Sequence, residues 1–467
     1  MSIAFYVLYG LSLLTIPHLL FRKKHPSATL AWLWGILLFP FAGALLYLAI
    51  GTDRLKRKRL RRHASFSSAR PARARTAWPR PALGPHDDAL VRQIERLNQI
   101  PASQVEEARL LPDADTFYQA LLRSIAGARH HIHIQFFIWR ADETGKRFLD
   151  ALVAAARRGV RVRVLLDEVG CLLLPSRYFR PLIEAGGEFS WFLTISPSRN
   201  RYLFNLRNHR KLQVIDGTVA FVGGMNIGRE YQGLDPAVGG WRDLQIELTG
   251  PVACVLQESF ADDWYFATDR HLDDACYYPP SPRAGPFTAL VIAGGPDSLH
   301  SPVQKSLLAL LQHARGRIWL TSGYFVPNSV TLTALQLCAA RGVDVRLLIS
   351  GKSDHPGLLH IGRSYYEELL EAGVRLFEYQ ASIHHSKTGI LDDDWLLVGS
   401  ANLDNRSMHL NFELNVLLHM PGRTAELAAT LRRDFDSARE IKLETFRRRP
   451  LREKWIEALC RPFGPVL

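Results

Sequence analysis

Cysteine is scarce in this chain of 467 residues. The five cysteines are scattered, and no two of them have the spacing of a metal-ligand pair: Cys171, Cys254, Cys276, Cys338 and Cys460. This pattern argues against a disulfide framework and against a zinc site, and it favours reduced thiols in the cytoplasm. No other cluster of ligand residues in the sequence indicates a metal or an organic cofactor.

Charged residues are missing from two stretches near the N-terminus. None occurs before Arg22, and residues 27–50 contain none over 24 positions. The stretches 2–20 and 27–50 are each long enough to cross a hydrocarbon core, at about 1.5 Å per residue of helix. A cleaved signal peptide is excluded, because no basic region precedes the first stretch and a second long one follows it. Two buried helices of a soluble protein remain the alternative.

A strongly basic segment follows the second apolar stretch. Residues 51–80 contain eleven basic residues and one acidic residue, which accounts for +10 of the net charge of +13. Basic residues beside a membrane segment favour the cytoplasmic side and attract anionic headgroups, at about 1 kcal/mol each. We expect a two-pass hairpin with both ends cytoplasmic. A shallow hairpin that does not cross is the alternative, because Arg22, Lys23 and Lys24 make the intervening loop basic too.

The residues that can carry chemistry occur in a motif present twice. A histidine is followed by lysine at +2, aspartate at +7, glycine at +14 and asparagine at +17, on strand-like runs. The two sets are His209, Lys211, Asp216, Gly223 and Asn226, and His385, Lys387, Asp392, Gly399 and Asn402. A given histidine has this Lys and Asp spacing by chance roughly once in several hundred tries, so two complete copies are hard to assign to coincidence.

Sequence outside the motifs repeats as well. From about residue 105 the pattern alternates between helix and strand: a helix over 116–126, a strand over 132–139, a helix over 145–158 and a strand over 160–166. Similar segments recur 183 to 187 positions later, such as Arg158-Gly-Val and Arg341-Gly-Val. We therefore predict an internal duplication of one α/β unit, with mainly parallel sheets covered on both faces.

The predicted organisation follows from these patterns, with the boundary between the two copies at a cluster of prolines. It comprises two membrane-associated hydrophobic helices over 1–50, a basic linker over 51–103, a first α/β unit over 104–276, a proline-rich connector over 277–287, a second unit over 288–448 and a tail over 449–467.

The doubled His-x-Lys-x4-Asp motif resembles that of the phospholipase D superfamily. The surrounding sequence, over about residues 105–445, is similar to that of bacterial cardiolipin synthases in particular. The segments that carry this resemblance are Gly223-Gly-Met-Asn-Ile-Gly, Trp241-Arg-Asp, Gly399-Ser-Ala-Asn-Leu-Asp-Asn-Arg-Ser and Asn411-Phe-Glu. The resemblance implies two phospholipase D-like α/β/α units that form one site. It also implies that the histidine of the first half, His209, is the nucleophile and His385 the acid and base, although the two roles could be exchanged.

The motif residues suit chemistry on an anionic phosphodiester. One neutral imidazole can attack phosphorus while the other, protonated, donates to the departing oxygen. Lys211 and Lys387 can neutralise the non-bridging oxygens, so a metal is unnecessary. Hydrogen bonds to the phosphate are expected from Asn226, Ser400 and Asn402.

The resemblance also places an acid on the strand after each glycine-asparagine turn, where it can orient an imidazole. Glu413 fits that place in the second half and Asp243 in the first. The motif itself includes Asp216 and Asp392 among the catalytic candidates. However, seven residues along a strand place them near its far end, which favours a structural role. Gly224 stands where the second copy has Ser400, so we expect an asymmetric site.

The resemblance implies a cardiolipin synthase that joins two phosphatidylglycerols and releases glycerol, at the bacterial inner membrane with its catalytic units on the cytoplasmic side. A membrane-bound phospholipase D that makes phosphatidic acid, a phosphodiesterase nuclease and a non-catalytic scaffold are the alternatives. The apolar N-terminus argues against the nuclease, and basic residues beside a bilayer explain the charge without nucleic acid. The expected partners are anionic phospholipid and the bilayer, and the oligomeric state is left open.

Overall fold

The computed structural model describes residues 9–10, 12–21, 26–50, 82–193, 206–280, 285–298, 301–353 and 356–464. These residues fall into two compact units. One contains the N-terminal helices, and the other contains the described residues from 82 onward. The basic segment expected at 51–80 and part of the expected connector, 281–284, lie outside the described residues.

The N-terminal unit is built from short apolar helices: α2 (Thr15–Phe21), α3 (Pro26–Leu38) and α4 (Pro40–Ile50). The buried Tyr47 organises it, with its hydroxyl 2.8 Å from Nδ1 of His18 and its ring edge-on to Trp32. The run at 27–50 thus forms two helices, not the single helix expected. Pro40 begins the second because proline is favoured in a first helical turn and disfavoured inside a helix. In the part of the chain that the structure describes, no helix has both the length and the apolar character of a membrane span.

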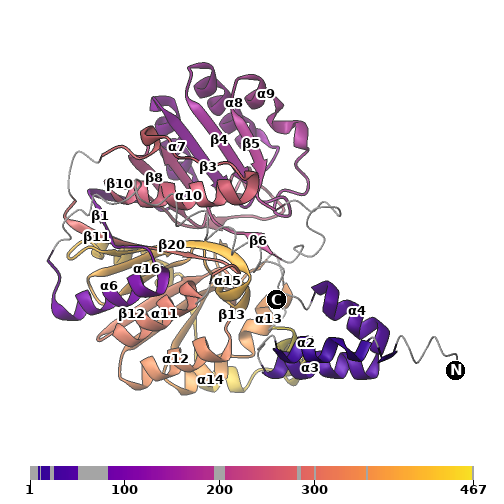
Figure 1. Cartoon of the computed structure of the whole chain (residues 1–467). Coiled ribbons are helices and arrows are strands. Elements are labelled where there is room, and N and C mark those ends of the chain that lie inside the picture. Colours follow the sequence, from indigo (N-terminus) through magenta and orange to yellow (C-terminus); the bar gives the residue numbers. More distant parts are fainter. Residues whose placement is uncertain are drawn as a thin grey trace. The chain divides into compact units, whose positions relative to one another are not determined.

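The first half of the larger unit contains a seven-stranded sheet in the order β2-β10-β8-β7-β3-β4-β5. Helices α7, α8 and α9 lie on one face of this sheet, and α10 packs against its other face (Figure 1). The elements are β2 (Glu107–Leu111), α7 (Ala114–Gly127), β3 (His131–Phe136), α8 (Glu143–Arg157), β4 (Arg161–Leu166), α9 (Arg180–Glu184), β5 (Glu188–Trp191), β6 (Arg207–Asn208), β7 (Leu212–Ile215), β8 (Val219–Gly223), η2 (Arg229–Gln232), β9 (Trp241–Arg242), β10 (Gln245–Thr249) and α10 (Val252–Thr268).

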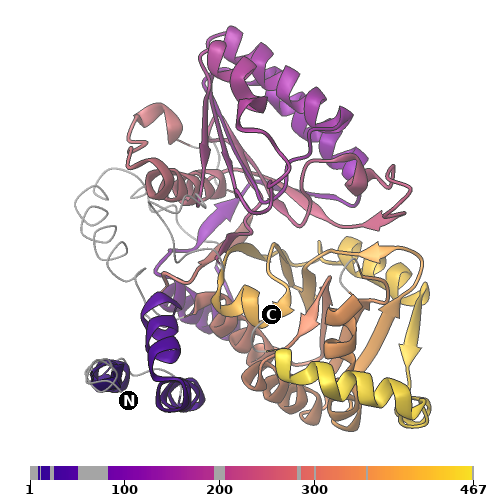
Figure 2. The ribbon, with the colours of Figure 1, turned by 90° about the vertical axis from the view of Figure 1, so that its right-hand side faces the viewer.

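The second half contains a ten-stranded sheet in the order β1-β11-β20-β18-β17-β12-β14-β15-β21, with β6 beside β20. Figure 2 shows this half with α18 on its outside, in yellow. The elements are β11 (Phe287–Gly294), α11 (Pro302–His313), β12 (Arg317–Ser322), β13 (Phe325–Val326), α12 (Ser329–Ala340), β14 (Asp344–Ser350), α13 (Pro356–Arg363), α14 (Tyr366–Glu371), β15 (Arg375–Tyr379), β16 (Ile383–His384), β17 (Thr388–Leu391), β18 (Trp395–Gly399), β19 (Leu403–Asp404), α15 (Asn405–His409), β20 (Asn411–His419), α16 (Ala425–Asp436), β21 (Ala438–Ile441), α17 (Leu443–Arg447) and α18 (Leu451–Cys460).

The duplication is confirmed by matching strands in the two halves. Strands β3, β4 and β5 run parallel in the first half, as β12, β14 and β15 do in the second. Each half buries its own apolar core, formed by the faces of its helices and strands that turn inward. The alternation of helix and strand in the sequence therefore identified the repeated unit correctly.

The prediction of mainly parallel sheets is wrong, because both sheets are mixed and most of their pairings are antiparallel. The strands that follow the motif histidines are the reason. In the first half, β7 and β8 form a hairpin whose turn contains Asp216 and Gly217, with φ of 53° and 67°. A turn this short connects antiparallel strands, whereas a parallel pair needs a long crossover.

Part of the expected linker over 51–103 is folded. Helix α6 (Pro85–Asn98) packs on α11 and β11 through the buried Leu90, Val91 and Ile94, and β1 (Ser103–Val105) pairs with β11. Residues that precede the first half thus belong to the core of the second half. The three apolar residues lie on one helical face, a spacing that predicts an amphipathic helix.

Candidate active site

The backbone of each motif histidine is held by the opposite half of the unit. Strand β6 pairs with β20, and the His209 N–H donates to the Phe412 carbonyl at 2.9 Å. Strand β16 pairs with β9, and the His385 N–H donates to the Arg242 carbonyl at 2.7 Å. The two short parallel pairings place both histidines at the junction between the halves.

The carboxylates that orient the imidazoles also come from the opposite half. Glu413 follows Phe412 on β20, and both of its oxygens lie 3.1 Å from Nδ1 of His209. Asp243 follows Arg242, and its Oδ2 lies 2.7 Å from Nδ1 of His385. With Nδ1 engaged, each ring leaves Nε2 for a substrate. Glu413 lies on the strand expected, whereas Asp243 lies between β9 and β10, and each contacts the histidine of the other copy.

Ser400 and Gly224 explain why the two copies differ. The buried Ser400 hydroxyl donates to the Glu413 carboxylate and accepts from the Leu414 N–H at 3.0 Å, so it supports Glu413 and does not line the cavity as a phosphate ligand. At Gly224, an added Cβ would lie 2.2 Å from Oδ1 of Asp243. The first copy therefore has no room for a serine, because Asp243 occupies that space.

The ammonium group of each motif lysine contacts the backbone of the histidine in its own motif. Lys211 is fully buried, and its ammonium donates to the His209 carbonyl at 2.7 Å. The Lys387 ammonium likewise donates to the His385 carbonyl. Burial lowers the pKa of Lys211 to about 7. The charge of Lys387 also lowers this pKa, while the charge of Glu413 raises it. Two cationic groups thus share one buried region, which favours an anion nearby.

The same charges act on the histidines and on their carboxylates. Burial lowers the pKa of His209, and burial with the Lys387 ammonium lowers the pKa of His385 to about 4. Burial alone would raise the pKa of Asp243, but the charge and hydrogen bond of His385 outweigh it and bring the pKa to about 2. The pKa of Glu413 is lowered in the same way by His209 and Lys211. At neutral pH the site therefore contains neutral imidazoles facing ionised carboxylates.

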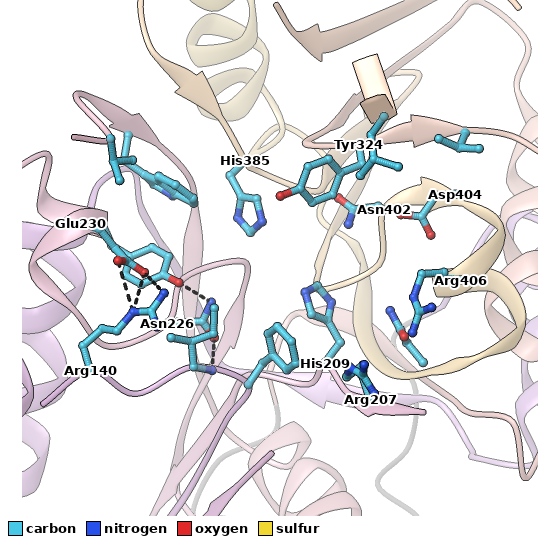
Figure 3. Close-up of a pocket in the computed structure, with 18 of the residues that line it drawn as sticks. Arg140, Arg207, His209, Asn226, Glu230, Tyr324, His385, Asn402, Asp404 and Arg406 are labelled. Atoms are coloured by element: carbon cyan, nitrogen blue, oxygen red, sulfur yellow. Dashed lines mark hydrogen bonds and ion pairs between the residues drawn. The ribbon is translucent and has the colours of Figure 1, made fainter. Parts of the chain in front are cut away.

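Both imidazoles face a cavity of about 800 Å³ (Figure 3). Asn226 and Asn402 line it from the two halves. The Asn226 amide is engaged with the Ile138 N–H and the Tyr231 hydroxyl, both at 3.0 Å, whereas the buried Oδ1 of Asn402 has no hydrogen-bond partner among the described residues. Much of the remaining wall is apolar or aromatic: Phe137, Val238, Trp241, Tyr324, Val326 and Leu358.

Asp216 and Asp392 do not line the cavity. The Asp216 carboxylate accepts hydrogen bonds of 2.8 to 2.9 Å from the N–H groups of residues 129–131, and Asp392 accepts from those of residues 315–317. Each aspartate also occupies a left-handed turn position, with φ of 53° and 51°. They close the hairpin that follows each histidine and fasten it to the start of the neighbouring strand.

Positive charge is unevenly distributed around the cavity. On one side, Arg207 lies beside His209 and Arg406 lies near Asp404 (Figure 3). On the opposite side, Arg140 forms an ion pair with Glu230, with an N–O distance of 3.1 Å. Burial raises the pKa of Asp404 to about 6, and its side chain caps α15 through the Ser407 N–H. The cavity wall beside His209 is therefore the more basic one.

Comparison with known sequences decides the family. A model described as cardiolipin synthase, PLD-like domain, matches residues 121–235 and 307–439, which together make up more than half of the chain. The chain belongs to this cardiolipin synthase family. The cardiolipin synthase of Alkalihalophilus pseudofirmus is 35% identical over 99% of this chain and 93% of its own length. That of Geobacillus kaustophilus is 36% identical over 96% of this chain and 90% of its own length.

Two further similarities concern the fold and the N-terminus. The crystal structure of a phosphatidylserine synthase from Haemophilus influenzae covers 81% of this chain and 97% of its own, with a TM-score of 0.60 and 16% identity. At that identity the likeness is one of fold. A family model described as phospholipase D-nuclease N-terminal matches residues 10–51.

In this cardiolipin synthase family member, two ion-paired arginines, Arg210 and Arg242, connect the two halves of the larger unit beside the site. Arg210 forms two 2.7 Å contacts with Asp263 on α10, and it also donates to the carbonyls of Gly294 and Glu413 in the second half. Arg242 pairs with Asp434 of the second half, at N–O distances of 3.0 and 3.1 Å. Each arginine is next in sequence to a residue that contacts the other half, His209 or Asp243, so these bonds hold that part of the backbone in place.

Sequence reasoning did not assign a role to several residues of the cavity. Arg207 stands two positions before His209, and Arg406 lies inside the segment that follows the second motif. Both are near the motifs, but their proximity depends on the pairing of β6 with β20. His131 and His133 lie buried away from the cavity, and Tyr324 forms part of its wall.

Proposed function

We propose that this protein makes cardiolipin by transferring a phosphatidyl group from one phosphatidylglycerol to a second, with release of glycerol. The observation that carries the proposal is the pair of imidazoles at one cavity, each with Nδ1 held by a carboxylate. Two facing histidines can divide a phosphodiester exchange into two displacements at phosphorus.

In the first displacement, Nε2 of His209 attacks phosphorus, and the bond from phosphorus to the headgroup oxygen breaks. His385 gives its proton to that oxygen, and glycerol leaves. In the second displacement, His385 takes the proton from a headgroup hydroxyl of the second phosphatidylglycerol. The oxygen then attacks phosphorus, the phosphorus–nitrogen bond breaks, and His209 returns to its neutral form.

Protonation of His385 accompanies substrate binding in this mechanism. In the protein alone its pKa is about 4, chiefly because of burial and the charge of Lys387. A phosphodiester beside the two ammonium groups would offset that charge and raise the pKa of His385. The acid would therefore be charged mainly when an anionic substrate is present. Lys211 and Lys387 would stabilise the charge on the non-bridging oxygens.

The acceptor lipid carries a phosphate of its own, and we assign that phosphate to Arg207 and Arg406. Both arginines line the cavity on the side of the proposed nucleophile. A guanidinium binds phosphate through paired hydrogen bonds. Water and free glycerol lack this phosphate, so the two arginines would favour lipid acceptors over hydrolysis.

We further propose that the N-terminal unit attaches the protein to the cytoplasmic face of the bacterial inner membrane. Its described helices are apolar, and the following segment, 51–80, is strongly basic. The two repeats at 104–276 and 288–448, with their proline-rich connector at 277–287, form the catalytic part in this proposal. The basic linker would keep this catalytic part close to anionic lipid. Residues 449–467 would form a C-terminal segment after the second repeat.

The direct test is lipid product analysis with the purified protein and radiolabelled phosphatidylglycerol in vesicles. Cardiolipin and free glycerol are expected in equal amounts, with little phosphatidic acid. Added glycerol should reverse the reaction, because both directions exchange one phosphodiester for another. If phosphatidic acid dominates and glycerol has no effect, the protein is a phospholipase D and not a synthase.

Arg406→Gln should weaken the use of a lipid acceptor. We expect the KM for phosphatidylglycerol to rise about tenfold, since a charge-assisted hydrogen bond contributes about 1.5–3 kcal/mol, and the ratio of phosphatidic acid to cardiolipin should increase. Arg157→Gln serves as the matched control, because Arg157 is exposed on α8 and does not line the cavity. An unchanged product ratio in Arg406→Gln would remove the assignment of the acceptor phosphate.

A further inference from the structure

The C-terminal helix α18 and the short helix η4 (Arg461–Phe463) present a row of large apolar side chains to solvent. Leu451, Trp455, Leu459 and Phe463 are 73%, 67%, 66% and 62% exposed. The three residues of α18 are four positions apart, which places them on one face of the helix. The four residues together are called the C-terminal apolar stripe.

The one fully buried residue of α18 is charged, which is unusual for a surface helix. This residue, Glu457, accepts two hydrogen bonds from Arg449, at 2.7 and 3.1 Å. Arg461 at the start of η4 donates to the Ser364 carbonyl at 3.2 Å. A helix that covers only its own core turns its apolar face inward. Here the ion pair holds α18 in the orientation that exposes the C-terminal apolar stripe.

The C-terminal apolar stripe lies one helix away from the cavity. Helix α13 packs against both α18 and η4. The first turn of the same helix α13 contributes Gly357 and Leu358 to the cavity wall. One helix therefore separates the exposed apolar residues from the site where the headgroup would react.

The segment that carries the C-terminal apolar stripe is rich in basic residues, of which Arg447, Arg449 and Arg461 form ion pairs with Glu367, Glu457 and Glu368. Residues 447–461 contain six basic and two acidic residues. Arg448 and Arg452 are exposed, and Arg452 directly follows the first residue of the stripe. An apolar helical face bordered by arginine and lysine is typical of a helix that lies in the interface of an anionic membrane.

Two other occupants suit this surface less well. A second copy of the chain would bring the same basic residues against themselves in a symmetric contact, which is repulsive. The apolar N-terminal segment, residues 1–50, contains no acidic residue to match the basic border. Anionic phospholipid supplies both the apolar and the negative component.

Exposed leucines also lie beside the cavity wall in the first half. Leu172 and Leu173 follow Cys171, whose sulfur accepts from the Trp139 N–H and donates to the Phe137 carbonyl. Leu234 is 63% exposed and follows η2, which carries Glu230 and Tyr231 of the wall. Apolar residues thus adjoin the wall of the cavity in both halves.

We propose that the C-terminal apolar stripe inserts into the interface of an anionic bilayer and docks the catalytic unit directly onto the membrane. This contact is additional to the N-terminal attachment. It would present the cavity to lipid headgroups while the acyl chains stay in the bilayer. The expected effect of this membrane contact on turnover rests on the lipid substrate proposed above. The contact itself does not depend on which reaction the protein catalyses.

Photocrosslinking in the full-length protein identifies the occupant. A photocrosslinking amino acid replaces Trp455, and the same residue in place of Leu337 is the control, because Leu337 is 62% exposed on α12 away from the cavity wall. With phosphatidylglycerol vesicles we expect lipid adducts at position 455 at least five times as abundant as at position 337. A crosslinked dimer, or an adduct to residues 1–50 without lipid adduct, would overturn the proposal.

Activity measurements then test what the contact does. Trp455→Glu and Leu459→Glu should each lower the rate on phosphatidylglycerol vesicles about tenfold, and leave the rate on monomeric short-chain phosphatidylglycerol within twofold of the wild type. Leu337→Glu should change neither rate. Equal losses on both substrates, or no loss on vesicles, would contradict docking. If the wild type makes no cardiolipin from either substrate while position 455 still crosslinks to lipid, the proposed reaction fails and the membrane contact stands.

Discussion

Replacing His209 with alanine is expected to lower transfer by about 10⁴- to 10⁶-fold, the range seen when a catalytic nucleophile is removed. Without this imidazole no phosphatidyl-enzyme can form on the first half. His385→Ala should be equally inactive in turnover, because no group then protonates the leaving glycerol. The two variants differ in the adduct, since His385→Ala retains the nucleophile and a substrate with a better leaving group should still label it.

The measurement uses phosphatidylglycerol labelled in its phosphate, followed by denaturation at alkaline pH, where phosphohistidine is preserved, and peptide mapping. Label is expected on the peptide that contains His209. His271→Ala is a suitable control, because His271 is exposed and does not line the cavity. Label on His385 in the wild type would reverse the two roles.

Replacing Lys211 with methionine should reduce activity about 10²- to 10³-fold and at the same time stabilise the protein at neutral pH. The activity is lost because an ammonium that stabilises the charged phosphate is removed. Stability increases because the wild type buries this ammonium completely. A functional residue that opposes folding is expected where a site is built to bind an anionic substrate.

The pH dependence of unfolding follows from the pKa of Lys211. Burial lowers this pKa from 10.5 to about 7 in the folded protein. Between these values the unfolded chain holds a proton that the folded chain lacks, so the wild type should gain stability as the pH rises from about 7 towards 10. The gain is on the order of a few kcal/mol. Lys211→Met should lose this component, whereas the control Lys146→Met, at an exposed position, should retain it.

Denaturant unfolding of the wild type and both variants at several pH values in this range measures the effect. Equal pH dependence in the wild type and Lys211→Met would show that the ammonium is not the source. A wild type that loses stability over the same range would contradict the sign of the linkage.

The two motif copies were sufficient to predict the family, the duplication and the meeting of His209 with His385 in space. The spacing of Lys211 and Lys387 was informative because two residues along an extended chain return to the same face. The sequence also contained Glu413 and Asp243 at the positions expected. It did not show which imidazole each would serve, because that depends on the pairing of β20 with β6 and of β9 with β16.

The parallel arrangement of the sheets was misjudged for a local reason. The alternation of strand and helix over 132–166 is truly parallel, but the hairpin closed by Asp216 adds antiparallel strands to the same sheet. Helix α6 was missed because its apolar residues stand beside a long basic segment whose composition is typical of a linker. For α6, the short-range pattern was outweighed by its packing on α11 and β11, which lie far along the chain.

The exchange of carboxylates between the halves has a consequence for how such a chain can be divided. A repeat on its own would contain a histidine without its orienting acid and an acid without its histidine. Neither fragment can therefore be a half-active enzyme, and activity should return only when both are recombined. Because both copies are in one chain, each can change its sequence to suit the other. The second copy has Ser400 bonded to Glu413, whereas the first has Gly224, which leaves space for Asp243.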